Sequence, residues 1–190
     1  MFRSLLLPTF TSIVYFGGIA DCNEDSTREE SFVVVKFGGS ALTKKNEFET
    51  LNTNNLSKIS DQIKRIQDRR LIFIHGAGSF GHFSAKNYKL AFGGDEFWLE
   101  GLAITRRSVT KLNGLVLDAF LAASIPAVSV SLFPLSIANE EGAINENRII
   151  TSAFNLLKLG FLPIFHGDVL IDNRNRCKIY SGDKILKWIC

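Results

Sequence analysis

Short apolar runs alternate with segments of helical periodicity from about residue 31 to the end of the chain. Runs that are rich in Val, Ile and Phe and contain few polar residues are typical of strands buried on both faces. Strands are therefore expected at residues 32–37, 71–75, 127–131 and 161–165, and a hairpin-like segment is expected at residues 172–180.

The segments between these runs have apolar residues at every third or fourth position, which is the spacing of one face of an α-helix. Three helices are expected, with apolar stripes at Leu56, Ile59, Ile63 and Ile66, at Val109, Leu112, Val116 and Phe120, and across residues 151–159. Asn55 is placed to cap the first helix, and Gly160 ends the third. The alternation of strands and helices predicts an α/β sandwich with a largely parallel sheet.

Composition narrows the class of ligand. The chain has 190 residues, of which 46% are hydrophobic and 22% charged, so it can bury the core of one domain. Its formal net charge of +3 is spread along the sequence, which argues against nucleic acid as a partner and favours small anions. The cysteines, Cys22, Cys177 and Cys190, are odd in number and lack metal-ligand spacing. They indicate a reducing compartment, and the cytoplasm is the expected location.

Residues 1–30 differ in character from the rest. Arg3 precedes an apolar stretch at residues 5–20 that Pro8 and several hydroxyl residues interrupt, and an acidic run follows it. The outline resembles a signal peptide, but the cleavage region is poor, and the stretch is too short and too polar for stable membrane insertion. A targeting segment and an extra exon or start-site artefact both remain open, so we treat residues 1–30 as an N-terminal extension of a domain at residues 31–190.

A glycine-rich turn follows the expected strand at residues 71–75. Gly76, Gly78 and Gly81 lie close together, and His82 stands near what the pattern predicts as a helix start. Glycines let the backbone approach an anion closely, and the free N–H groups at a helix N-terminus favour a phosphate there. This turn therefore predicts an anion site to which the His82 imidazole donates a hydrogen bond.

A second glycine turn, Gly38 and Gly39, ends the first expected strand. Lys36 precedes it, and Lys44 and Lys45 follow within a few residues. One of the two turns is suited to an acceptor phosphate and the other to a donor phosphate. Neither pattern matches the P-loop or the dinucleotide fingerprint, and an ordinary reversal of the chain is the alternative for each turn alone.

Polar motifs also follow the last expected strand. His166 is expected to satisfy backbone groups, whereas Asp168, beyond Gly167, is expected to fix the direction of lysines held near phosphates. Because ligands bind at the carboxyl ends of strands in open α/β sheets, these segments predict one shared crevice. Residues 181–183, Ser-Gly-Asp, form an ordinary cap before a helix at residues 184–190.

Four motifs, in this order, resemble the amino-acid kinase superfamily and, within it, the isopentenyl phosphate kinase family of the eukaryotic type. They lie at residues 36–40, 75–82, 166–168 and 181–183. His82 is the most specific element, because in that family this histidine contacts the phosphate of the acceptor. The resemblance implies a three-layer αβα sandwich with a central, mainly parallel sheet.

The resemblance implies a phosphotransferase that moves the γ-phosphate of ATP to isopentenyl phosphate, with Mg²⁺, in isoprenoid biosynthesis. The catalytic residues it implies are Lys36, Lys45, His82 and Asp168. The residues it implies on the ATP side are Lys36, Gly38, Gly39, Ser40, Lys45 and Gly78. Those it implies on the acceptor side are Gly76, Ala77, Gly81, His82, Gly167, Ser181 and Gly182, with Thr105 and Val109 beside the prenyl tail.

The same resemblance implies a nucleotide-binding lobe that would follow Cys190, so a C-terminal lobe is expected to be missing. Three functions stay open at this point. The chain is an active isopentenyl phosphate kinase, a truncated and inactive product that only binds the acceptor phosphate, or a kinase of another phosphate or phosphonate such as fosfomycin. The family also implies a homodimer.

Overall fold

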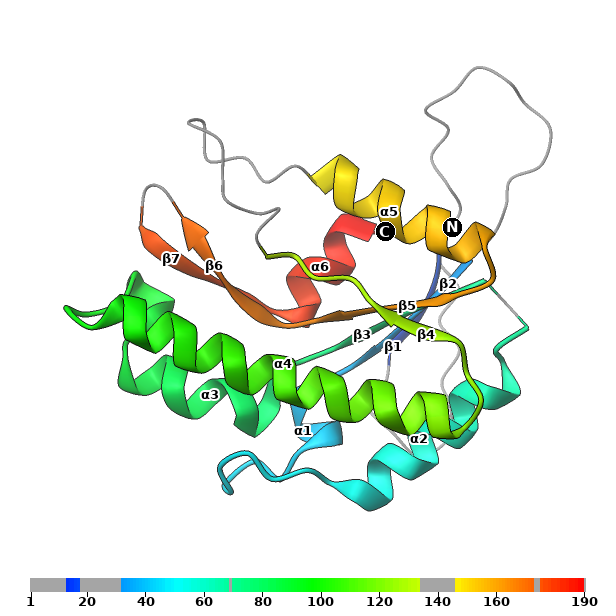
Figure 1. The fold of residues 1–190 in the computed structure, drawn as a ribbon, viewed down its shortest axis with the longest axis horizontal. Coiled ribbons are helices and arrows are strands. Elements are labelled where there is room, and N and C mark those ends of the chain that lie inside the picture. The colour runs from blue at the N-terminus through cyan, green and yellow to red at the C-terminus, as the bar shows by residue number, and fades with distance from the viewer. Residues whose placement is uncertain (1–12, 18–31, 69, 134–145, 173–174, 190) are drawn as a thin grey trace.

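The computed structural model describes residues 13–17, 32–68, 70–133, 146–172 and 175–189, which form a central sheet with helices on both faces (Figure 1). Its strands are β1 (Ile13–Gly17), β2 (Phe32–Phe37), β3 (Leu71–His75), β4 (Ala127–Ser129), β5 (Leu162–His166), β6 (Asp168–Asp172) and β7 (Arg176–Tyr180). Its helices are α1 (Gly39–Leu42), α2 (Thr53–Arg65), α3 (Gly78–Asn87), the 3₁₀ turn η1 (Leu90–Phe92), α4 (Trp98–Ala122), α5 (Glu146–Lys158) and α6 (Gly182–Ile189).

The central sheet has the strand order β1-β2-β3-β5-β4, and all of its pairings are parallel except that of β1 with β2. Helices α2, α3 and α4 lie on one face, and α5 and α6 lie on the other (Figure 1). A separate antiparallel hairpin, β6–β7, continues directly from the end of β5. The expected three-layer α/β sandwich with a mainly parallel sheet is confirmed.

The apolar runs became strands because both faces of the sheet are covered. Val33 and Val35 pack into the core beneath α2 and α4, whereas Val34 packs with residues of α5 and α6 on the other face. Successive strand side chains point to opposite faces, so a strand covered on both sides needs a continuous apolar run. The pattern predicted β2 and β3 with the observed bounds, while β4 ends two residues earlier than expected.

Each helix begins before the segment that predicted it, and the cap of α2 was predicted wrongly. Asn52, not Asn55, is the N-cap, because its side-chain oxygen accepts a hydrogen bond from the Asn55 amide at 3.2 Å. The Asn55 side chain instead donates to the Ala41 carbonyl. Helix α4 begins at Trp98, well before the stripe that predicted it. The hairpin likewise begins earlier than expected, at Asp168.

The N-terminal extension contributes to the sheet. Residues Ile13–Gly17 form β1, which pairs antiparallel along the whole of β2. This segment lies within the apolar stretch whose outline resembles a signal peptide, so no strand was predicted there, and the strand with which it pairs lies further along the chain. The remainder of residues 1–30, Cys22 included, and Cys190 lie outside the described residues. Among the described helices, none combines the length and apolarity that crossing a bilayer requires.

Candidate functional site

A pocket lies where the carboxyl ends of β2, β3 and β5 meet the start of the β6–β7 hairpin, and it encloses about 680 Å³ including the space at its open mouth. Strand register produces this meeting, because Phe37 pairs with His75 and His75 pairs with His166. Fourteen of the residues that the sequence predicted line it: Lys36, Gly38, Gly39, Gly76, Ala77, Gly78, Gly81, His82, Thr105, Val109, Gly167, Asp168, Ser181 and Gly182.

The two predicted glycine turns pack against each other through their backbones. A Cβ on Gly39 would lie 2.1 Å from the Gly78 nitrogen, and a Cβ on Gly76 would lie 2.6 Å from the Gly39 nitrogen. Real Cβ atoms do not approach other atoms this closely, so a side chain at either position would push the turns apart. The Gly76 amide also donates to the Phe37 carbonyl at 3.0 Å. The glycine turns therefore present bare backbone at the polar end of the pocket.

Thr43 joins these two turns, and sequence reasoning missed it. Its hydroxyl donates to the Gly39 carbonyl at 2.9 Å and accepts from the Ser79 amide at 3.0 Å, at the first turn of α3. Gly78 has a φ of +52°, and a Cβ there would lie 2.2 Å from the Thr43 hydroxyl oxygen. The N-cap residue of α3, Ala77, has no side-chain acceptor for the helix amides. The N-terminus of α3 thus faces the pocket at Ala77, held in place from behind by Thr43.

Two more segments close on the end of β3. The Gly167 amide donates to the His75 carbonyl at 2.8 Å. A Cβ on Gly182 would lie 3.3 Å from that same carbonyl, and a Cβ on Gly167 would lie 3.3 Å from the Ala77 nitrogen. The glycines of the third and fourth motifs therefore serve close packing around one strand end. This is the shared crevice that the order of the motifs predicted.

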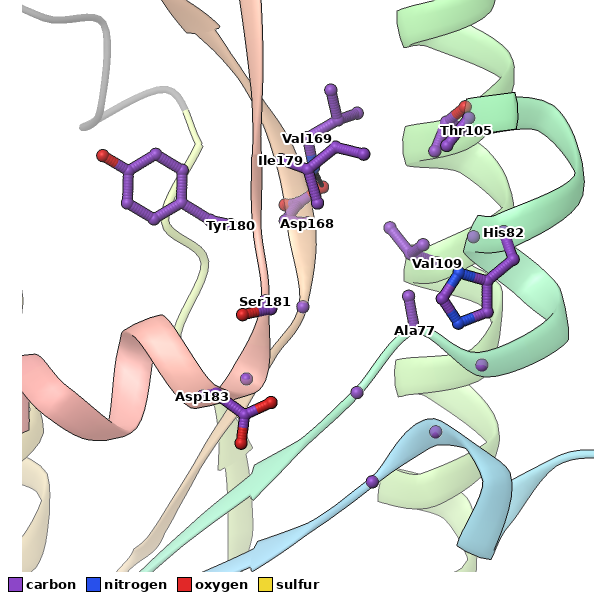
Figure 2. Close-up of a pocket in the computed structure, with 18 of the residues that line it drawn as sticks. Ala77, His82, Thr105, Val109, Asp168, Val169, Ile179, Tyr180, Ser181 and Asp183 are labelled. Carbon is purple, nitrogen blue, oxygen red and sulfur yellow. Dashed lines mark hydrogen bonds between the residues drawn. The ribbon is translucent and has the colours of Figure 1, made fainter. Parts of the chain in front are cut away.

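His82 lies on α3 with an exposed side chain, and its ring faces the pocket beside Ala77 and Val109 (Figure 2). Gly81 lets α3 pack closely against Val109 of α4, because a Cβ on Gly81 would lie 2.5 Å from the Ala77 Cβ and 3.3 Å from a Val109 methyl group. An exposed imidazole about one turn into a helix can turn to an anion bound at the helix N-terminus without breaking a packing contact.

Lys36 and Asp168 were expected to pair with each other, but each has a different partner. The Lys36 ammonium donates to Asp183 at 2.7 Å, and no hydrogen bond or ion pair among the described residues joins it to Asp168. Asp168 instead forms an ion pair with Arg106 of α4. The guanidinium of Arg106 also stacks on Phe133, 4.2 Å from the ring centroid. The expectation that Asp168 orients the lysines is therefore not what the structure shows, because Arg106 is the cation that α4 places beside it.

Asp168 is a buried acid. Its side chain is 1% exposed, and one carboxylate oxygen accepts from the Val169 amide at 2.8 Å. Burial raises the pKa of Asp168 to about 6, while the positive charge of Arg106 acts in the opposite direction. The carboxylate therefore depends on Arg106 for its ionised form near neutral pH.

Two buried histidines, His75 and His166, stack behind the pocket with ring centroids 5.8 Å apart. Burial lowers the pKa of each to about 4, so both rings are neutral at neutral pH. The His166 ring lies 3.1 Å from the Gly167 carbonyl, which it satisfies as the sequence predicted. The His75 ring lies between the Gly76 carbonyl and the Asn113 side chain, at 3.1 and 3.2 Å. These rings support the strand ends rather than face the ligand space.

The other end of the pocket is apolar. Val169 and Ile179 of the hairpin face Thr105 and Val109 of α4 across it (Figure 2), and Ala85 completes the wall. The hydroxyl of Thr105 donates to the Ser84 hydroxyl at 2.9 Å, so it is already satisfied. The pocket is thus suited to a molecule with an anionic head and a hydrocarbon tail.

Two of the predicted site residues, Ser40 and Lys45, do not line the pocket, and five residues that do line it were not predicted. Ser40 is exposed on α1, and Lys45 is exposed in the loop at residues 44–49. The Lys44 amide donates to the Thr50 carbonyl, which closes this loop on itself. The missed residues are Ala85, Val169, Ile179, Tyr180 and Asp183. Asp183 stood beside the predicted Ser181 and Gly182 and was interpreted only as part of a cap.

Comparison with known proteins adds independent evidence. A sequence model of the Amino acid kinase family matches residues 31–190. Isopentenyl phosphate kinase of Methanothermobacter thermautotrophicus is 34% identical over 165 residues, which cover 81% of this chain and 60% of the relative. Isopentenyl phosphate kinase of Arabidopsis thaliana is 30% identical over an alignment of 209 positions, gaps included, which covers 89% of this chain and 63% of the relative.

Solved structures agree with the sequence comparison. A crystal structure of an isopentenyl phosphate kinase substrate complex superposes with a TM-score of 0.70 at 30% identity, covering 80% of this chain and 62% of that chain. The product complex of T. acidophilum isopentenyl phosphate kinase superposes with a TM-score of 0.68 and the same identity and coverage. The chain spans 60 to 63% of the length of the two curated relatives described above.

Proposed function

Since this chain belongs to the amino acid kinase family, we propose that it is the acceptor-binding part of an ATP-dependent isopentenyl phosphate kinase, which forms isopentenyl diphosphate for isoprenoid biosynthesis. One observation carries the proposal: a single pocket has a backbone-lined polar end and an apolar end. Isopentenyl phosphate has the same two parts, a phosphate and a branched hydrocarbon chain. The relatives named isopentenyl phosphate kinase support this choice of acceptor.

The acceptor phosphate is placed at the N-terminus of α3, beside the Ala77 amide and within the turn that Gly76 and Gly78 form. Backbone N–H groups and the helix dipole stabilise an anion at such a position. The His82 imidazole then donates a hydrogen bond to a phosphate oxygen. Because glycine has no side chain, the phosphate can approach the backbone of this turn directly.

The donor phosphate is placed at the neighbouring turn, where Lys36 precedes Gly38 and Gly39. ATP with Mg²⁺ would supply the phosphoryl group and much of the charge neutralisation. The close backbone packing at Gly39 fits this role, since a side chain there would collide with Gly78, and the turn therefore keeps its backbone bare. Among the described residues, no group of three or more His, Cys, Asp or Glu side chains could hold a metal ion. We therefore expect phosphate oxygens to provide most of the Mg²⁺ ligands.

Phosphoryl transfer requires mainly positioning and charge stabilisation from the protein. A phosphate monoester has a second pKa of about 6, by analogy with phosphorylated side chains, so an acceptor oxygen is already ionised without a general base. That oxygen forms the new bond to the γ-phosphorus of ATP as the bond from this phosphorus to the bridging oxygen breaks, and ADP leaves. Lys36 and the glycine amides stabilise the charge that develops, and the apolar end keeps water from competing.

Binding of the acceptor by the purified chain is the first test. Isopentenyl phosphate, inorganic phosphate, isopentenol and fosfomycin would be titrated side by side in a calorimeter, and transfer from labelled ATP would be measured on the same sample. We expect isopentenyl phosphate to bind most tightly. A preference for fosfomycin would support the phosphonate kinase alternative instead, and equal binding of inorganic phosphate would remove the role of the apolar end.

Replacement of His82 tests the acceptor site directly. A hydrogen bond to a charged group contributes about 1.5–3 kcal/mol, so His82→Gln should weaken isopentenyl phosphate binding by roughly 10- to 100-fold. The side chain is exposed, so the melting temperature should stay close to that of the parent. Unchanged affinity in a folded His82→Gln variant would contradict the assigned role.

Two finer expectations remain predictions within this proposal. The family resemblance predicts a homodimer, which light scattering of the purified chain would test. The cysteine content predicts a cytoplasmic enzyme, which imaging of a tagged full-length protein would test. Neither is needed for the binding mode above.

A further inference from the structure

A short chain of hydrogen-bonding groups runs behind the turn that precedes α3. The His75 ring contacts the Gly76 carbonyl through Nδ1 at 3.1 Å and the Asn113 side-chain amide through Nε2 at 3.2 Å. Asn113 in turn lies 2.8 Å from the Ser129 hydroxyl. His75 and Asn113 are buried, whereas Ser129 is exposed. The chain therefore connects β4, at the edge of the sheet, with the glycine turn at the pocket.

The hydrogen-bonding partners of the His75 ring fix the place of its proton. A neutral imidazole has one N–H, and the Gly76 carbonyl can only accept, so the proton lies on Nδ1. Nε2 is then an acceptor, and with the Asn113 oxygen toward it two acceptors would meet. A half-turn of the Asn113 amide gives Nε2 a donor and lets the amide oxygen accept from the Ser129 hydroxyl. A charged ring that donates on both sides is disfavoured by complete burial.

The Gly76 carbonyl shares a peptide unit with the Ala77 N–H. In a trans peptide these two groups point in opposite directions. The His75 ring holds the carbonyl from behind, so the Ala77 N–H is turned to the pocket, which Ala77 lines at the start of α3 (Figure 2). The Ala77 nitrogen borders Gly167, where an added Cβ would lie 3.3 Å from it. Among the described residues, no group accepts a hydrogen bond from this amide.

We propose that His75 and Asn113 are positioning residues, which orient the peptide between Gly76 and Ala77 so that the Ala77 N–H donates to the phosphate of the acceptor. This inference rests on the proposed function and deepens it. Neither side chain lines the pocket, so both act through the peptide. A donor that already faces the anion needs no reorientation when the anion binds, and such preorganisation strengthens binding of charge.

The place of the His75 proton is the first test. The chain has three histidines, so ¹⁵N-labelling of histidine gives a small set of ring signals that single variants assign. We expect His75 to be neutral with its proton on Nδ1, both in the free chain and with inorganic phosphate bound. A proton on Nε2 would leave the Gly76 carbonyl without its donor and would overturn the inference.

Two amide side chains separate the positions of the donor. The side-chain nitrogen of Asn reaches about as far as Nδ1 of histidine, whereas that of Gln reaches about as far as Nε2. His75→Asn should therefore keep phosphate affinity near that of the parent. His75→Gln should weaken the binding of inorganic phosphate and of isopentenyl phosphate about tenfold in calorimetry. Equal affinities of the two folded variants would contradict the inference.

The Ala77 amide reports the orientation of the peptide directly. In ¹⁵N-labelled protein at saturating inorganic phosphate, its proton signal should move downfield in the parent and in His75→Asn, because the amide gains a charged acceptor. The shift should be smaller in His75→Gln. An Ala77 signal that keeps its position while phosphate binds to the parent would also overturn the inference.

Ser60 provides the control for loss of a buried donor. Its hydroxyl donates to the Leu56 carbonyl at 3.0 Å inside α2, and it does not line the pocket. Ser60→Ala should leave phosphate affinity unchanged, even where the melting temperature falls. If the parent binds isopentenyl phosphate and the Ala77 amide does not respond, the positioning inference fails and the proposed function stands. Absence of isopentenyl phosphate binding by the parent would instead contradict the proposed function.

Discussion

The two ends of the pocket are built by different means. At the polar end, Gly39 and Gly78 meet backbone to backbone, and a single added carbon on Gly39 would lie 2.1 Å from its neighbour. At the apolar end, Val109, Val169 and Ile179 form the wall with side chains. Backbone geometry cannot vary without moving whole turns, whereas side-chain volume can vary at one position. We therefore expect the anion site to tolerate few amino-acid substitutions, whereas the size of the tail site can change through single substitutions.

The largest effect should come from filling the polar end. Gly39→Ala places a Cβ against the Gly78 backbone, so it should separate the turns, destabilise the fold by several kcal/mol and abolish phosphate binding. Gly114→Ala is the matched control, because a Cβ there meets nothing within 4 Å inside helix α4. It should stabilise the chain by about 0.5–1 kcal/mol. Thermal unfolding and phosphate titration of both variants would measure the contrast.

The next largest effect on stability should come from the ion pair between Arg106 and Asp168, a residue that lines the pocket. Loss of one partner from a buried pair typically costs about 3–5 kcal/mol, so Arg106→Met should be strongly destabilising at pH 8. Burial already raises the pKa of Asp168 to about 6, and loss of Arg106 should raise it further. Denaturant unfolding at several pH values would measure the penalty.

The pH dependence has a defined sign. An acid whose pKa is raised by folding contributes stability below its unfolded pKa and loses it as pH rises through the folded pKa. The penalty of Arg106→Met should therefore be largest above pH 7 and should shrink as pH falls below about 6, where Asp168 is protonated in both proteins. Arg107→Met, on the exposed neighbouring residue, is the control and should change little. A penalty that is independent of pH would point to lost packing on Phe133 instead.

The smallest effect should come from the adjustable end. Ile179→Ala removes side-chain carbon from the tail wall, and each buried methylene contributes about 0.8 kcal/mol. Isopentenyl phosphate should bind several-fold more weakly, while the affinity for inorganic phosphate should not change. Ile171→Ala, in the same hairpin but off the wall, is the control. A matching loss of inorganic phosphate binding would mean that the two ends are not separable.

Much of the site was predictable because its residues follow strand ends. The glycine turns after β2 and β3, together with His82 and Asp168, were identified from local sequence, and the structure brings them to one pocket. The apolar residues Val169 and Ile179 were missed because their alternation in a short hairpin is also typical of ordinary core. Lys45 was placed in the site because it follows Gly39 closely, but the loop that carries it does not line the pocket.

Local sequence by itself determined most of the strands and helices and located the glycine turns, because hydrophobic periodicity and turn residues act over a few positions. Only the tertiary structure decided which charges meet. Lys36 pairs with Asp183, 147 positions away, and Arg106 pairs with Asp168, 62 positions away. Such partners depend on how the sheet orders its strands and where each helix ends. No local pattern encodes that geometry, so the charge pairing of the pocket emerged only from the fold.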